Sequence, residues 1–434
     1  MNPARSASAP STAAAATGPR RLAIIGAGPI GVEAALLAVT RGWRVAVYDA
    51  GQVGEHLLRY GDTVLFTPFG MTSTPLGRDR LRASGHEVPP EGALLRARDL
   101  VSSYLAPMAS LPELRDGIRE RARVTHVGRD GFTKTGSSRA GADATREGSE
   151  FLLRIEAPGG ETRFERADVV IDASGIYGQP NGTGPGALPA LGEDRVGDAI
   201  DRHLPPTLSD LRERVAGRRV LLVGDGHSAA TALRMFDELS RDRDAAPERV
   251  EWIRRDRGRA EPFVEVEGDP LPARRELAAE ANRIARSSPW ITTHRGATVL
   301  SYERSGSGSL RVTVSGAGDA RTLEVDRVLA LVGYRPDLSI TRELQIHHCY
   351  ASEGPMKLAA AILSAGIASS AHAGDCLSQV SHGPESLRNP EPGFFVLGAK
   401  SYGRNASFLL SLGHRQIEDV LTLLGDPARE PVTA

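Results

Sequence analysis

The chain repeats one pattern of apolar and polar positions in two places. The apolar run LAII at 22–25 leads into glycines and then into VEAALLAV. The run VLLV at 220–223 leads into glycines in the same way and then into SAATALRMF. A short apolar run that ends in glycine is typical of a buried parallel strand, and the small residues after it favour a helix. The pattern therefore predicts two strand–turn–helix units in an α/β protein.

The first unit has the glycine spacing of a dinucleotide-binding turn. Gly26, Gly28 and Gly31 form G-x-G-x-x-G within GAGPIG, which also holds Pro29. Gly26 permits the tight turn, Gly28 lets the backbone approach a pyrophosphate, and Gly31 lets helix and strand pack closely. The next strand, in WRVAVYDA, ends in Asp49, where a carboxylate can accept hydrogen bonds from an adenosine ribose. Together these features favour FAD or NAD over a purely structural turn.

The second unit repeats the turn with one substitution. Gly224 and Gly226 take the first two glycine positions, and Ala229 takes the third. Between them lie His227 and Ser228, whose hydroxyl can donate a hydrogen bond or cap the helix. We therefore expect a second dinucleotide here.

Basic residues stand where the first unit has its acid. Arg254 and Arg255 follow the strand RVEWI, and Arg259 comes shortly after. Guanidinium groups hold a ribose 2′-phosphate through charge-assisted, bidentate hydrogen bonds. The alternative is a solvated basic loop, because arginine is common in this chain. We expect NADPH, since a flavin that accepts hydride from NADPH is the most economical pairing of two dinucleotides.

These motifs resemble the two-dinucleotide-binding-domain flavoproteins, which include thioredoxin reductase, the flavin-containing monooxygenases and the ornithine or lysine N-hydroxylases. GAGPIG is similar to their FAD fingerprint and GDGHSA to their NADPH fingerprint, while IRRDRGRA is similar to the 2′-phosphate-binding run of thioredoxin reductase, with Ile253 in place of histidine. The resemblance extends from about residue 20 to 425. It implies two Rossmann-like domains, with the NADPH domain inserted in a discontinuous FAD domain.

Two strand-and-turn segments mark the expected crossovers between the domains. ADVVIDASGIYGQPN at 167–181 contains Gly175 and resembles the exit from the FAD domain, and DRVLALVGYRPD at 326–337 resembles the return. Each is an apolar strand that ends in glycine before a proline-containing exit. The expected organisation is a disordered tail at 1–19, an FAD-binding domain at 20–199 and 326–425, an NADPH-binding domain at 200–325, and a tail at 426–434.

The C-terminal contact to the flavin has two candidates. The family closes with a strand and a Gly-Asp pair beside the flavin ribityl chain. GFFVLGAK has a clear strand before Gly398 but Ala399 where aspartate is usual, whereas HAGDC has Asp375 without a clear strand. We favour Gly398 and keep Asp375 as the alternative.

Composition narrows the class of protein. The 434 residues are 40% hydrophobic and 25% charged, which is typical of a soluble globular protein. A net charge of −1 gives no reason to expect nucleic acid or a membrane surface as a partner. No run is long and apolar enough to span a membrane, and the first 20 residues lack the apolar centre of a secretory signal. A cytoplasmic location is expected.

The positions of the two cysteines limit the class of reaction that the protein can catalyse. Cys349 and Cys376 form no Cys-x-x-Cys pair, which argues against a dithiol reductase. The HHC run at 347–349 places neighbouring side chains on opposite faces of a strand, so we expect no metal site. His203 is either a remnant of the monooxygenase F-x-G-x-x-x-H signature or a helix-end residue.

The resemblance then implies a monooxygenase that oxygenates a small molecule through a flavin hydroperoxide. The expected partners are that substrate and molecular oxygen, with a homodimer as the candidate assembly. No catalytic side chain is assigned, because the flavin performs the chemistry. A reductase without a dithiol centre and a non-catalytic flavin-binding redox sensor are the alternatives. The segment at 63–77 is either part of the flavin and substrate pocket or a core-packing loop.

Overall fold

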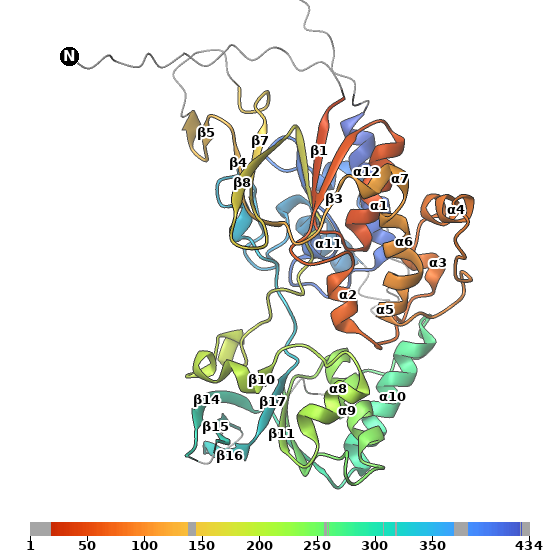
Figure 1. The fold of residues 1–434 in the computed structure, drawn as a ribbon. Helices are drawn as coiled ribbons and strands as arrows, with labels where there is room; N and C mark the ends of the chain where they lie inside the picture. The colour runs from red at the N-terminus through yellow and green to blue at the C-terminus, as the bar shows by residue number, and fades with distance from the viewer. Residues whose placement is uncertain are drawn as a thin grey trace, which may run out of the picture.

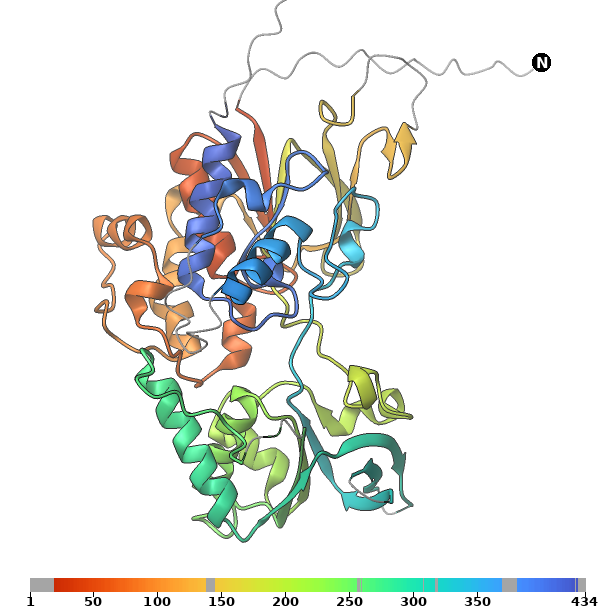
Figure 2. The ribbon, with the colours of Figure 1, turned by 180° about the vertical axis from the view of Figure 1, so that it is seen from behind.

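The chain forms two lobes that are joined by two extended segments (Figure 1, Figure 2). This computed structural model describes residues 19–137, 145–255, 258, 260–306, 308–316, 319–368, 381–425 and 427. The first lobe takes both ends of the described chain, and the second lobe is an insertion between them.

A five-stranded parallel sheet forms the centre of the first lobe. Its strand order is β18-β9-β1-β2-β3. The strands are β1 (Arg21–Ile25), β2 (Arg44–Tyr48), β3 (Ile118–Arg119), β9 (Val169–Asp172) and β18 (Phe394–Val396). Four of the five residues of β1 and all four of β9 are buried, as expected for a sheet covered on both faces.

The two faces of this sheet are covered by different elements. Leu22 and Ile24 point to the helices, whereas Ala23 and Ile25 point to an antiparallel sheet. That second sheet contains β4 (Arg123–Arg129), β5 (Phe132–Thr133), β6 (Gly136–Ser137), β7 (Phe151–Glu156) and β8 (Thr162–Ala167). The helices are α1 (Pro29–Thr40), α2 (Glu55–Tyr60), α3 (Phe69–Thr72), α4 (Pro75–Ala83), α5 (Ala97–Leu100), the π-helical η1 (Val101–Leu105), α6 (Ala106–Ala109), α7 (Pro112–Arg115), α11 (Met356–Ala368) and α12 (Leu410–Leu424).

The second lobe repeats this plan on a smaller scale. Its parallel sheet has the order β10-β17-β11-β12-β13. The strands are β10 (Ile200–Asp201), β11 (Arg219–Val223), β12 (Arg249–Arg254), β13 (Ile291–Arg295) and β17 (Arg327–Ala330). The helices are α8 (Leu208–Val215), α9 (His227–Leu239) and α10 (Pro272–Ser287), and an antiparallel sheet holds β14 (Thr298–Arg304), β15 (Leu310–Ser315) and β16 (Arg321–Val325). The predicted pair of Rossmann-like units, one inserted in the other, is confirmed.

The two crossovers run side by side between the lobes. Asn181 N donates to Gly333 O at 3.0 Å, and Arg335 N donates to Gln179 O at 2.9 Å. The boundaries predicted at 200 and 326 fall beside β10 and β17, which pair with each other in the second sheet. Short 3-10 turns at η2 (Pro185–Ala187), η3 (Glu193–Ala199), η4 (Ser339–Thr341), η6 (Pro384–Leu387) and η7 (Gly398–Tyr402) complete the described chain.

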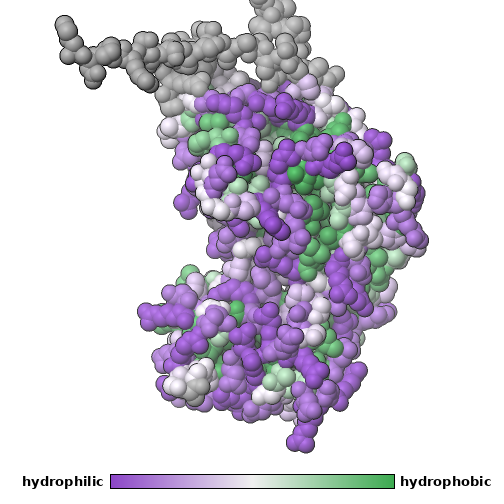
Figure 3. All heavy atoms as spheres, in the orientation of Figure 1, coloured by the Kyte–Doolittle hydropathy of each residue, from purple (hydrophilic) through white to green (hydrophobic). Residues whose placement is uncertain are grey.

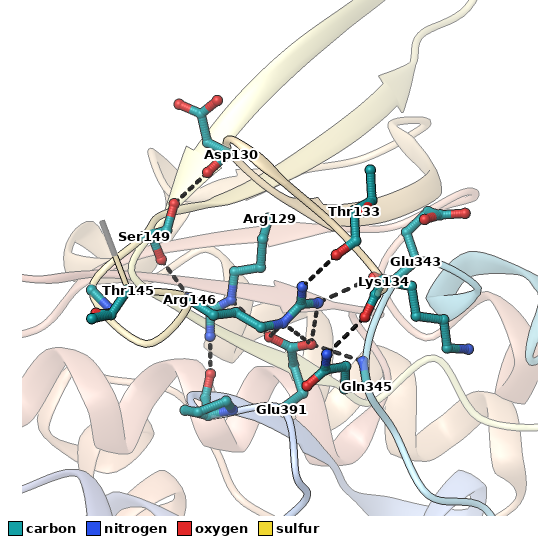
Figure 4. A network of polar contacts seen from close by, with 12 residues as sticks. Arg129, Asp130, Thr133, Lys134, Thr145, Arg146, Ser149, Glu343, Gln345 and Glu391 are labelled. Atoms are coloured by element: carbon teal, nitrogen blue, oxygen red, sulfur yellow. Dashed lines mark hydrogen bonds and ion pairs between the residues drawn. The ribbon is translucent and has the colours of Figure 1, made fainter. Parts of the chain in front are cut away.

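A buried ionic cluster ties the antiparallel sheet to the C-terminal part of the first lobe (Figure 4). Glu391 accepts from Arg129 Nε at 2.8 Å, from Arg146 Nη2 at 2.6 Å and from Gln345 N at 2.8 Å. The Glu391 side chain is completely buried. Phe151 also packs against the Arg129 guanidinium, with 3.6 Å from Cζ to the ring centroid. Because Glu391 pairs with Arg129 and Arg146, the cluster joins segments more than 240 residues apart.

The surface of the face in Figure 3 is mainly hydrophilic, with a hydrophobic band along the first lobe and a notch between the lobes. Over the described ranges, no helix combines the length and apolar character needed to cross a membrane.

Candidate functional site

The first glycine turn is shaped by two glycines and leaves space beside the third. Gly26 has φ +102°, and a Cβ there would lie 2.6 Å from Ala173 O. A Cβ on Gly31 would lie 1.8 Å from Gly26 O, so helix α1 can approach the turn only with glycine here. A Cβ on Gly28 would meet nothing within 4 Å. The backbone N–H groups at the start of α1, where Pro29 is the first residue, thus face open space that suits a phosphate group.

Asp49 holds this turn through its carboxylate. One oxygen accepts from Ala27 N at 2.7 Å, and the other accepts from Gly51 N at 2.7 Å. Each carboxylate oxygen has a further lone pair, so Asp49 can also accept from ribose hydroxyls. The acid after β2 therefore lies where the sequence predicts a ribose contact.

A cavity of about 520 Å³ opens in front of this turn. Six predicted site residues of the first lobe line it: Gly26, Gly28, Pro29, Asp49, Gly175 and Gly398. From the segment at 63–77, Leu65, Phe66, Thr67 and Thr72 also line it, whereas Phe69 is completely buried against Tyr104. Part of the segment thus lines the cavity, and part of it packs in the core.

The C-terminal wall of the cavity contains Gly398 and Ala399, which follow strand β18, and the segment 406–410, which leads into α12. Gly398 has φ +71° and packs against Ile30 of α1. The alternative contact, Asp375, lies outside the described residues.

A buried lysine lies behind this wall. Lys400 Nζ is 2.6 Å from Asp172 Oδ2 and 3.0 Å from Ser174 Oγ. Ser174 Oγ also donates to Asp172 Oδ1 at 2.7 Å, and Ser174 lines the cavity. The Lys400–Asp172 ion pair therefore fixes the hydroxyl of Ser174 at the cavity wall.

The second glycine turn contributes one residue, His227, to the lining of the same cavity. Gly224 has φ +130°, and a Cβ there would lie 2.2 Å from Leu331 O, whereas a Cβ on Gly226 would meet nothing within 4 Å. His227, the first residue of α9, lines the cavity, and its ring is 5.3 Å from that of Phe66. Ser228 is the second residue of α9 and is half-buried, but it does not line the cavity.

Ala229 is fully buried against the second sheet, as expected for close packing of helix on strand. Alanine is therefore small enough for the third position of this turn, where the first turn has Gly31.

The basic residues after β12 have partners within the chain. Arg255 Nη2 lies 3.2 Å from Asp225 Oδ1, and the Arg255 side chain is 72% exposed. The Arg254 guanidinium lies 5.9 Å from the ring centroid of Trp252, whose Nε1 donates to Gly224 O at 2.8 Å. Arg259 lies outside the described residues.

An aromatic cluster at the crossovers has no clear signal in the sequence. His203 stacks on Tyr177, with 4.3 Å between ring centroids, and its Nδ1 lies 2.9 Å from Tyr334 Oη. Tyr177 in turn contacts His56, which lines the cavity. Burial and the nearby Arg59 charge lower the pKa of His203 to about 4, so the ring is neutral at pH 7. His203 thus packs between the lobes.

The sequence also gives no signal for the cavity residues of α2 and α10. His56, Leu57 and Tyr60 come from α2, while Leu271 and Arg274 come from the start of α10. None belongs to a spaced motif, because these residues meet only through the placement of the two lobes. Among the described residues, no group of three or more histidine, cysteine or acidic side chains could hold a metal.

Solved structures share this fold over almost the whole chain. The bacillithiol disulfide reductase of Bacillus cereus matches with a TM-score of 0.64 at 16% identity, over 93% of this chain and 98% of that chain. The cadaverine monooxygenase of Erwinia amylovora, solved with FAD bound, matches with 0.61 at 12% identity, over 96% and 97%. The ornithine hydroxylase of Pseudomonas aeruginosa matches with 0.58 at 14% identity, over 92% and 97%.

The sequence matches no profile of a known protein family and no curated protein. The chain has the fold of the two-dinucleotide-binding-domain flavoproteins, as the two glycine turns predict.

Proposed function

We propose that this protein is an FAD-dependent oxidoreductase that takes electrons from NADPH and oxygenates a small molecule. One observation carries the proposal: a single cavity is lined by the first glycine turn, by the C-terminal turn and by His227 of the second glycine turn. Two dinucleotides held at these turns would present their reactive rings to a shared space, which hydride transfer requires.

The first lobe fits FAD. The open space beside Gly28 and the start of α1 suit the pyrophosphate, Asp49 suits the adenosine ribose, and Gly175 and Gly398 line the part of the cavity beyond them. FAD held by these residues would supply the hydride-accepting and electron-transferring chemistry that no side chain of the cavity provides.

The second lobe fits a nicotinamide dinucleotide. The open space beside Gly226 and the start of α9 suit its pyrophosphate. Arg254 and Arg255 lie at the carboxyl end of β12, where a 2′-phosphate would lie. Their charge supports NADPH over NADH.

Oxygenation is favoured over dithiol reduction by the lining of the cavity. No cysteine of the described residues lines it, whereas Leu65, Phe66, Leu409 and Leu410 do. An apolar lining excludes water, which oxygen activation in a flavoenzyme requires. The N-hydroxylating enzymes with this fold support the same proposal.

A reductase that passes electrons to an external acceptor is the second candidate. The similarity to a bacillithiol disulfide reductase supports it. In that case the substrate would supply the reducible group, because none of the described lining residues is a cysteine.

The test follows NADPH oxidation, oxygen consumption and hydrogen peroxide release with a panel of amines, sulfides, ketones and low-molecular-weight disulfides. A monooxygenase consumes oxygen with its substrate and forms an oxygenated product, and peroxide release falls as coupling improves. Anaerobic oxidation of NADPH by a disulfide would identify the reductase instead. Bound FAD that NADPH fails to reduce with every acceptor would contradict both candidates and indicate a redox sensor.

A further inference from the structure

The second lobe contributes a guanidinium group to the flavin cavity. Arg274 is the third residue of α10, and it lines the cavity together with Leu271 and His227. Within the described part of the chain, Arg274 is the only arginine or lysine in that lining. The glycine motifs in the sequence do not identify Arg274 as a site residue.

Arg274 is held in place by a buried acid. Its Nε lies 2.8 Å from Asp269 Oδ2, and its Nη2 lies 2.7 Å from Asp269 Oδ1. Asp269 Oδ1 also accepts from Leu271 N at 2.9 Å, and the Asp269 side chain is only 1% exposed. A bidentate pair fixes the plane of a guanidinium, so Arg274 presents a rigid group to the cavity.

The carboxylates and the guanidinium group of the cavity lie on different lobes. The acids of the lining, Asp49 and Glu55, belong to the first lobe, whereas the second lobe contributes Arg274 and His227. Burial, with a contribution from the Arg274 charge, lowers the pKa of His227, so its ring is neutral at pH 7. A fixed guanidinium beside a neutral imidazole offers hydrogen-bond donors to an anion.

Apolar residues also line the cavity next to this pair. Phe66 packs edge-on against His227, and Leu65 and Leu271 line the cavity beside it. In such surroundings an ionic hydrogen bond is stronger than in water. The ligand that suits this end of the cavity has an apolar or aromatic body and one anionic oxygen group.

We propose that Arg274, oriented by Asp269 and accompanied by His227, binds an anionic oxygen group of the ligand that faces the flavin. The proposal rests on the function proposed above. The anion has two candidate sources, the pyrophosphate of the nicotinamide dinucleotide and a carboxylate on the small-molecule substrate.

The experiment compares the FAD-loaded wild type with Arg274→Gln, and with Arg275→Gln as the matched control. Arg275 is the next residue of α10, is exposed and does not line the cavity. Binding of NADP⁺, NAD⁺, hexanoate and its neutral analogue hexanamide is measured by flavin absorbance changes and calorimetry. Arg274→Lys, which keeps the charge but not the planar fork, is the second variant if Arg274→Gln does not fold.

Loss of one ionic hydrogen bond predicts a roughly 10- to 100-fold weaker affinity in Arg274→Gln, a smaller loss in Arg274→Lys, and a change within about twofold in Arg275→Gln. Equal loss for NADP⁺ and NAD⁺ identifies the pyrophosphate as the anion, and loss for hexanoate but not hexanamide identifies a substrate carboxylate. Unchanged affinity for NADP⁺, NAD⁺ and hexanoate, or equal loss in Arg275→Gln, overturns the proposal. Two measurements on the wild type test the function proposed above separately: its flavin content, and the reduction of its flavin by NADPH.

Discussion

Gly28 and Gly31 stand three residues apart in one turn, yet the structure gives them different roles. A side chain at Gly31 would collide with the backbone of Gly26, whereas a side chain at Gly28 would enter the open space of the cavity. Gly28 has φ −79°, a value that any residue adopts. The fold therefore needs Gly31, and the proposed flavin site needs Gly28.

Gly28→Val should consequently fold and remain colourless, while Gly31→Val should lose about 3 kcal/mol or more of stability through overpacking. The ratio of flavin absorbance to protein absorbance and chemical unfolding measure the two effects. Flavin-stripped wild type is the reference for stability, because bound FAD itself stabilises the fold. Full flavin content in Gly28→Val would refute the assignment of this turn.

The existing ion pair of Arg255 limits how strongly this residue can bind a 2′-phosphate. Arg255 already pairs with Asp225, so part of its interaction with a 2′-phosphate would replace an existing one. We expect Arg254→Ala/Arg255→Ala to weaken NADPH roughly 10- to 100-fold, the worth of about one ionic hydrogen bond, and to leave NADH and FAD content nearly unchanged. Steady-state kinetics with both nucleotides measure this. An equal loss for NADPH and NADH would show that the arginines support the fold instead.

At the scale of single elements, helix α12 contains a buried histidine. His414 Nε2 is enclosed without a hydrogen-bond partner in the described part of the chain, and burial together with the Arg78 charge lowers the pKa of His414 to about 4. The unfolded chain takes up a proton at about pH 6.5, but the folded chain does so only near pH 4. His414 therefore does not oppose folding above pH 6.5. The free energy of unfolding decreases as the pH falls from 6.5 toward 4, because only the unfolded chain binds the proton in this range.

His414→Leu should therefore reduce the acid sensitivity of the protein, by up to about 3 kcal/mol between pH 7 and pH 4. Urea unfolding of wild type and variant across this range measures the difference in slope. Parallel pH profiles would show that His414 titrates normally in the folded chain.

The elements that could be predicted from the sequence are those with a local pattern. Strands β1 and β11 are short apolar runs before glycines, and their turns follow from Gly26 and Gly224. The strand before Gly398 is likewise confirmed as β18.

The rest of the candidate site has no local pattern. His56, Arg274 and Phe408 come from three distant segments, and the folding of two lobes against each other brings them to one cavity. Their spacing in the sequence carries no information about this, because the contact depends on how the crossovers place the second lobe.

At the scale of the molecule, the cluster around Glu391 joins distant parts of the first lobe (Figure 4). Glu391→Gln would leave Arg129 and Arg146 in a buried site without a carboxylate, and removing one partner of a buried ion pair costs about 3–5 kcal/mol. Glu385→Gln is the control, because Glu385 pairs with Arg388 at the surface, where such pairs contribute about 0–1 kcal/mol. Chemical unfolding of both variants measures the difference, and equal stability would contradict the structural role of the cluster.

The insertion of the second lobe also sets the order in which a nascent chain becomes complete. Strand β9 ends at residue 172, but its neighbour β18 begins at residue 394. At a synthesis rate of 5–20 residues per second, the ribosome needs roughly 10–45 s to add the chain between them. All strands of the second sheet have been synthesised by then, whereas the cavity still lacks Gly398. The proposed FAD site can therefore be complete only near the end of translation, after the inserted lobe has been synthesised.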